Sequence, residues 1–175
     1  MLTHSLLLPM TTIISATNRP DSMTLKIAKL YQQIFMEQGA DVQLVSLEGK
    51  AVWERSADMH QLEKEFLIPS QKFVFIMPEY NGSFPGIVKT MLDNSDIRNC
   101  WWGKKVMLTG VAAGRAGNLR GMEHMTNIMH YLRMHVFYNK LPISNIQEEI
   151  DQEGNLLQAA TRTVIEQQIE EFILF

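Results

Sequence analysis

Two stretches of the sequence combine residue types that could bind a phosphorylated, planar ligand. The first, residues 16–24, carries three hydroxyl side chains and one arginine just before a predicted helix. Free backbone N–H groups and the helix dipole favour an anion at a helix start, and arginine adds charge-assisted hydrogen bonds. The spacing fits neither GxxxxGK[ST] nor GxGxxG. The predicted phosphate-binding residues are Thr17, Arg19, Ser22, Met23 and Thr24. An alternative is that Ser22 only caps the helix and Arg19 lies in solvent.

The second stretch, residues 78–86, contains two prolines, two glycines and one tyrosine. Gly82 allows the backbone to approach a ligand closely. Backbone amides there could meet the polar edge of a flat heterocycle, while Tyr80 covers apolar surface. The predicted binding residues of this stretch are Pro78, Glu79, Tyr80, Asn81 and Gly82. The alternative is a rigid turn that starts a helix near Pro85.

The elements that position these stretches alternate between strand and helix. We expect strands over residues 10–16, 41–46, 72–77, 104–110 and 135–139. We expect helices over residues 22–38, 58–68, 85–95, 119–133 and 156–172, and a weakly paired segment over residues 146–149. This order is typical of an α/β fold with a five-stranded parallel sheet covered by helices on both faces. Ligands of such sheets bind beyond the carboxyl ends of the strands, where residues 17–22, 78–84 and 111–118 form the loops.

Composition narrows the class of protein. The 175 residues are 46% apolar and 20% charged, as in globular proteins, and suit one domain over residues 10–175 after a tail over residues 1–9 for which disorder is expected. The net charge of -3 offers no positive field for nucleic acid. No apolar run approaches the roughly 20 residues of a membrane span. Cys100 is the only cysteine, which excludes an internal disulfide and fits a reducing cytoplasm.

A metal centre is not predicted. The three histidines nearest to one another, His124, His130 and His135, are spaced by six and five residues, so no pair shares a helix face as in HExxH. Glu79 has no partner acid beside it in the sequence.

The stretch from Pro78 to Gly86, continued to Asp93, resembles the signature of the NADPH-dependent FMN reductase family, which commonly reads Pro-Glu-Tyr-Asn-Gly-Ser-x-Pro-Gly at the end of its third strand. The first loop resembles the family's Gly-Ser-x-Arg-x-x-Ser phosphate loop, with threonine and alanine in place of its serine and glycine. Residues 112–117 resemble a third, small-residue loop but lack its serine and paired glycines. From this third loop we expect contacts at Ala112, Gly114 and Arg115.

The resemblance covers residues 10–175 and implies a flavodoxin-like three-layer sandwich that binds FMN, with its phosphate on the first loop and its isoalloxazine against the other two. It implies an oxidoreductase that works by two-step hydride transfer. NADPH or NADH would reduce the flavin and leave, and a free flavin, a quinone or a similar small acceptor would then be reduced.

The resemblance also implies a homodimer or homotetramer. Two apolar features, the seam from Met122 to Leu132 and the pair Trp101-Trp102, offer surface for packing in the core or for self-association. Two other functions stay open: a flavodoxin-type electron carrier, and a flavin-less relative that binds or regulates. The altered first and third loops are the reason for the second alternative.

Overall fold

The computed structural model describes residues 10–175, so the tail predicted over residues 1–9 lies outside the described residues. The strands are β1 (Thr11–Ser15), β2 (Val42–Ser46), β3 (Lys72–Pro78), β4 (Lys105–Val111), β5 (His135–Val136) and β6 (Leu141–Ile143). Their order is β2-β1-β3-β4-β5, with β6 also paired to β4, and every pairing is parallel. The predicted parallel sheet is confirmed, with a sixth short strand.

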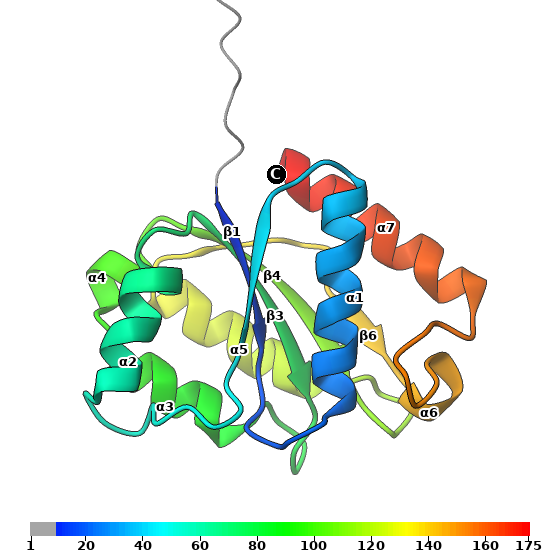
Figure 1. The fold of residues 1–175 in the computed structure, drawn as a ribbon, viewed down its shortest axis with the longest axis horizontal. Coiled ribbons are helices and arrows are strands. Elements are labelled where there is room, and N and C mark those ends of the chain that lie inside the picture. The colour runs from blue at the N-terminus through cyan, green and yellow to red at the C-terminus, as the bar shows by residue number, and fades with distance from the viewer. Residues whose placement is uncertain (1–9) are drawn as a thin grey trace, which may run out of the picture.

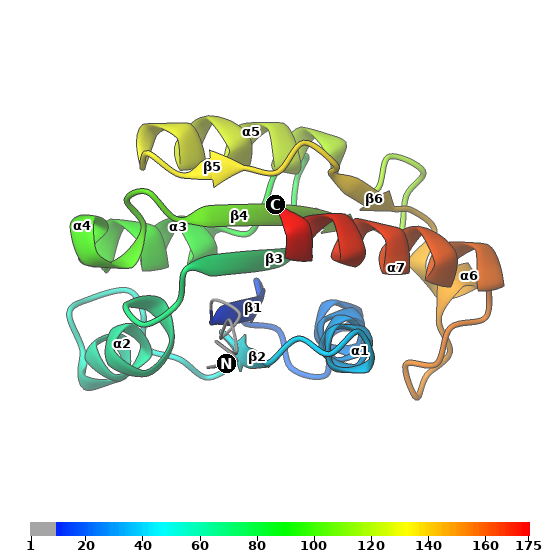
Figure 2. The same ribbon diagram turned by 90° about the horizontal axis from the view of Figure 1, so that it is seen from above.

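Helices cover both faces of the sheet (Figures 1 and 2). They are α1 (Met23–Glu37), α2 (Ala57–Leu62), α3 (Gly86–Asn94), α4 (Ile97–Cys100), α5 (Leu119–Tyr131), α6 (Ile146–Glu149) and α7 (Ala159–Leu174), and α2 continues as a π-helical turn over Glu63–Leu67. One face carries α1 and α7, whereas α2, α3 and α5 lie against the other. Because both faces are covered, all seven residues of β3 are buried.

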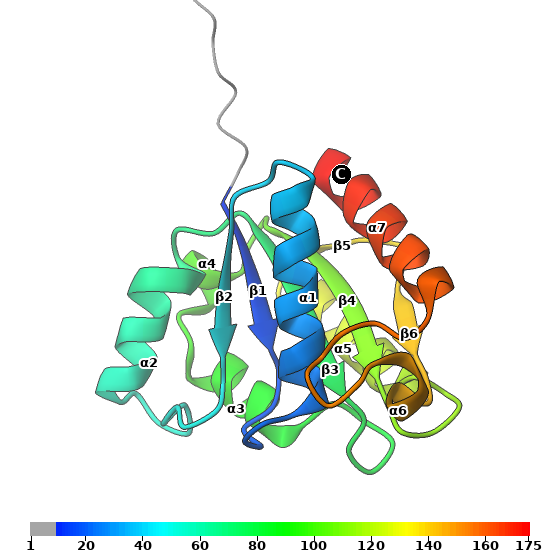
Figure 3. The ribbon, with the colours of Figure 1, turned by 45° about the vertical axis from the view of Figure 1, so that its right-hand side comes forward.

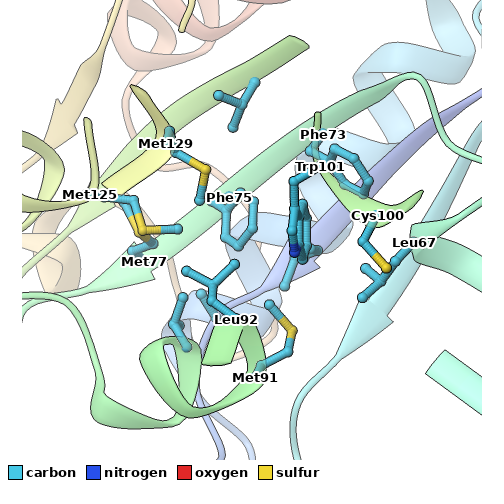
Figure 4. Packing of buried hydrophobic residues seen from close by; sticks show 14 of the residues in the cluster. Leu67, Phe73, Phe75, Met77, Met91, Leu92, Cys100, Trp101, Met125 and Met129 are labelled. Carbon is cyan, nitrogen blue, oxygen red and sulfur yellow. The ribbon is translucent and has the colours of Figure 1, made fainter. Parts of the chain in front are cut away.

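The methionine stripe of α5 belongs to the core. Met122, Met125 and Met129 are at most 1% exposed and lie in one buried cluster with Trp101 and the aromatic residues of β3 (Figure 4). Helical spacing turns these side chains toward the sheet. Packing therefore explains these three methionines and Trp101, which supply no surface for self-association.

The fifth strand is shorter than predicted. β5 stops at Val136, and β6 takes up the pairing farther along β4. In the gap, the buried amide of Gln168 donates to the carbonyls of Leu108 (3.4 Å) and Asn139 (2.8 Å). A side chain thus replaces part of the missing backbone ladder, since buried carbonyls need partners.

Three other expectations differ at helices. The predicted helix over residues 58–68 changes to π geometry at Glu63, where the N–H of Ile68 bonds the carbonyl of Glu63. Residues 146–149 form the short helix α6 instead of a paired segment. The last helix begins at Ala159, three residues later than expected, because residues 151–155 and the bridge from Ile150 to Leu156 form a turn before it.

Candidate functional site

A cavity of about 280 Å³ lies at the carboxyl ends of β1, β3 and β4, the lower edge of the sheet in Figure 3. All three predicted loops contribute to it. Its lining residues are Arg19, Pro20, Ser22, Met23, Thr24, Pro78, Glu79, Tyr80, Val111, Ala112, Ala113 and Ile146. Of the predicted binding residues, Thr17, Asn81, Gly82, Gly114 and Arg115 do not line it.

The first loop presents the start of a long helix to the cavity. Ser22 caps α1, and its hydroxyl accepts from the N–H of Leu25 at 3.1 Å. The N–H groups of Met23 and Thr24 have no acceptor among residues 10–175. Unpaired amides at the positive end of a 15-residue helix favour an anion. Ser22 therefore caps the helix, as the alternative interpretation of this loop predicted. The N–H groups of Met23 and Thr24 nevertheless stay free within residues 10–175.

The second loop is a tight hairpin turn. Tyr80 and Ser83 exchange two backbone hydrogen bonds of 2.8 and 3.1 Å around Asn81 and Gly82. Both central residues have positive φ, 54° and 75°, which explains the Asn-Gly pair. Their N–H groups have no acceptor within the described part of the chain. A Cβ built on Gly82 would meet only Arg120, at 3.9 Å, so this glycine is required by its backbone angle.

Tyr80 joins the first two loops. Its hydroxyl bonds the hydroxyl of Thr17 at 2.7 Å, and the guanidinium of Arg19 lies 3.9 Å from the centre of its ring. Thr17 also accepts from the N–H of Arg19 and is 1% exposed. The Thr17 hydroxyl thus fixes the loop from within, whereas Arg19 is exposed at the cavity. The residue types alone could not separate these two tasks.

The third loop reaches the cavity only at its beginning. The N–H of Ala112 donates to Ile143, and its carbonyl accepts from Ile146, at 2.9 and 3.1 Å. These bonds bring α6 to the cavity, a contribution that no local pattern in the sequence signalled. Gly114 and Arg115 are exposed and stand apart from the lining.

A larger groove of about 810 Å³ lies between α1 and residues 152–159 and shares Ser22 with the candidate site. Two of its basic groups are engaged within the chain. Lys26 donates to the carbonyl of Gln152 at 2.7 Å, and Arg162 pairs with two glutamates. We place the candidate site in the smaller cavity, because all three predicted loops line it and the free N–H groups of Met23 and Thr24 belong to its lining.

Two other kinds of site lack support among residues 10–175. No three histidine, cysteine or acidic side chains converge there as a metal site would require. Burial is the largest cause, and the negative charge of Glu63 the second, that raise the pKa of the Cys100 thiol to about 12, which is unsuitable for a nucleophile.

None of the helices within residues 10–175 has the length and apolar character needed to cross a membrane.

Solved structures share this fold along nearly the whole chain. The flavoenzyme FerB of Paracoccus denitrificans, an NAD(P)H:(acceptor) oxidoreductase, superimposes with a TM-score of 0.75 at 20% identity, covering 94% of this chain and 95% of the other. A flavodoxin of Streptococcus pneumoniae gives 0.63 at 10% identity, covering 94% and 98%. The predicted flavodoxin-like fold is confirmed, and reductases and flavodoxins share it.

Sequence relatives are more specific. An NAD(P)H-dependent FMN reductase of Pseudomonas aeruginosa is 29% identical over 110 residues, which are 61% of this chain and 60% of that protein. A 2-hydroxy-1,4-benzoquinone reductase of a Burkholderia species is 27% identical over 108 residues, 59% and 58% of the two chains. This chain thus spans about 60% of the length of these relatives. Residues 9–148 match the NADPH-dependent FMN reductase family, as the loop motifs predicted, and the chain belongs to that family.

Proposed function

We propose that this chain binds FMN in the cavity at the ends of β1, β3 and β4 and acts as an NAD(P)H-dependent oxidoreductase toward a small acceptor. The observation that carries the proposal is the start of α1 in the cavity lining, where the N–H groups of Met23 and Thr24 have no acceptor among residues 10–175. A second set of such donors lies at the tip of the Tyr80–Ser83 turn, whose first residue also lines the cavity. The family and the names of the relatives support the same activity.

The donor set fits the two polar parts of FMN. The amides of Met23 and Thr24, the Ser22 hydroxyl and the Arg19 guanidinium would hold the phosphate, since anions bind helix starts and arginine. The amides of Asn81 and Gly82 would face the pyrimidine edge of the ring. Ala112 and Ile146 add apolar surface to the lining of the cavity.

When bound, FMN supplies the redox chemistry by taking up a hydride from the nicotinamide cofactor and passing it to the acceptor. The residues of this chain bind and orient. Backbone donors at Asn81 and Gly82 would favour negative charge on the ring edge, and the exchanged hydrogen bonds of Tyr80 and Ser83 keep those donors in place beforehand. The acceptor we propose is a free flavin or a quinone, which the names of the relatives support.

The decisive experiment is reconstitution with FMN followed by turnover. We expect purified protein to retain FMN after gel filtration and to oxidise NADPH or NADH when a quinone or free FMN is added. Protein that binds FMN but leaves NAD(P)H unchanged would be a carrier. Protein that cannot bind FMN would be a flavin-less relative, and either result contradicts the proposal.

We further propose a homodimer or homotetramer in the cytoplasm. A groove of about 430 Å³ between α3 and α5 includes Ile97 and Tyr131, which are 40% and 83% exposed. Exposed apolar residues around a groove are typical of subunit contacts. Light scattering at low micromolar concentration measures the mass of the particle in solution, and the mass of a monomer would exclude self-association there.

The single cysteine supports the proposed location in the cytoplasm, which is a reducing compartment.

A further inference from the structure

Asn118 is a buried polar residue that the site described above does not use. It has left-handed backbone geometry, φ 64°, immediately before α5, and it is fully buried. Its amide nitrogen donates to the carbonyls of Met77 and Pro78, both at 3.0 Å. These are the last two carbonyls of β3, and the next residue begins the loop that carries the Tyr80–Ser83 turn.

These two bonds hold the side-chain amide of Asn118 with its nitrogen toward β3. Within residues 10–175 the Oδ1 atom has no hydrogen-bond partner. Turning the amide over would set that oxygen against two carbonyl oxygens, so the network fixes which end points at β3. An unpaired buried acceptor costs free energy, and the two bonds to β3 must offset that cost.

The space for the Asn118 side chain depends on a glycine beside it. A Cβ on Gly121 would lie 2.1 Å from Oδ1 of Asn118 and 2.8 Å from the N of Phe84. The first turns of α5 also touch the hairpin: Nδ1 of His124 bonds the Ser83 hydroxyl at 2.9 Å. The start of α5 therefore supports the second loop at both of its ends.

We propose that Asn118 is a positioning residue for flavin binding: its side chain fixes where β3 ends and so where the amides of Asn81 and Gly82 lie. The expected effect of Asn118 on FMN binding rests on the proposed function. Its expected effect on the position of the loop does not depend on that function. Asn118 does not line the cavity, so any effect on the ligand passes through the loop.

The test compares two Asn→Gly variants. Asn118→Gly keeps the left-handed backbone and removes the two bonds to β3. The control Asn145→Gly also keeps a left-handed backbone, before α6, but removes no bond, because this exposed side chain makes none within residues 10–175. In the ligand-free protein we expect amide exchange at residues 79–84 to be about tenfold to thirtyfold faster in Asn118→Gly, because two buried hydrogen bonds are lost. Asn145→Gly should leave exchange there unchanged.

FMN titration provides the second measurement. We expect Asn118→Gly to raise the FMN dissociation constant about tenfold and to shift the redox potential of bound FMN, and Asn118→Asp to do so at least equally, since a carboxylate repels two carbonyls. Unchanged exchange at residues 79–84, or faster exchange with unchanged FMN affinity and potential, would overturn the proposal. If wild-type protein does not bind FMN, the proposed function fails, and the exchange measurement still decides whether Asn118 fixes the loop.

Discussion

The loops after β1 and β3 are linked to each other by side-chain contacts, whereas the middle of the loop after β4 is exposed. Thr17, Arg19 and Tyr80 form a connected set: the Thr17 hydroxyl bonds the Tyr80 hydroxyl and accepts from the N–H of Arg19, and the Arg19 guanidinium lies over the Tyr80 ring. Residues 113–116 of the third loop are exposed, and Gly114 is held by one bond of 3.3 Å from the N–H of Asn145. From this difference we expect the first two loops to be preorganised for binding and the third to be the more mobile.

Removing the Arg19 side chain from this connected set should cause the largest loss of FMN affinity. Arg19→Ala removes both the guanidinium at the cavity and its contact with Tyr80. We expect FMN affinity to fall by about 1.5–3 kcal/mol, because a charge-assisted hydrogen bond is lost. Titration with FMN measures this, and Arg19→Lys, which keeps the charge without the planar group, should recover part of the loss. An unchanged dissociation constant in Arg19→Ala would remove Arg19 from the site.

Two substitutions of Gly82 distinguish a steric block of FMN binding from backbone strain in the turn. Gly82→Val places a branched residue at φ 75°, so we expect about 1–3 kcal/mol of lost stability even without ligand. Gly82→Asn tolerates this angle and should keep a melting temperature near that of the wild type. We expect it to bind FMN about tenfold more weakly, because its side chain occupies space at the tip of the turn. Normal FMN binding by Gly82→Asn would place the isoalloxazine elsewhere.

The link between the first two loops should contribute less. Tyr80→Phe removes the 2.7 Å bond to Thr17 and keeps the ring under Arg19. We expect a loss of about 1 kcal/mol in the free energy of unfolding and a smaller loss of FMN affinity than in Arg19→Ala. Denaturant titration and FMN titration together test this order. A loss of affinity as large as that of Arg19→Ala would show that the hydroxyl, and not the guanidinium, dominates.

The third loop should respond least. Arg115 is exposed, and a Cβ on Gly114 would meet no atom within 4 Å. We expect Arg115→Ala and Gly114→Ala to change stability by less than about 0.5 kcal/mol, and FMN affinity by about twofold at most. Melting temperature and FMN titration check both values. A loss of affinity above tenfold would mean that the loop closes over the ligand, and the comparison between the loops would fail.

Local patterns in the sequence determined much of this protein. Alternating strands and helices and the Pro78–Gly86 motif predicted the parallel sheet, its three ligand-side loops and the family. The helix predicted over residues 22–38 is present as α1, and its face with Ile27, Tyr31 and Phe35 is buried. Such features depend on residues close in the chain, because helix and strand periodicity and turn geometry are local.

The tertiary structure decided what depends on residues far apart in the chain. Thr17 meets Tyr80 across 63 positions, Asn118 reaches Met77 across 41, and Gln168 fills the gap beside β4 across 60. Local propensity carries no information on such pairs, because each side chain can bond many partners and the packing of the sheet selects one. For the same reason the sequence indicated that Thr17 was a polar residue of the site, and only the fold showed that its hydroxyl faces Tyr80.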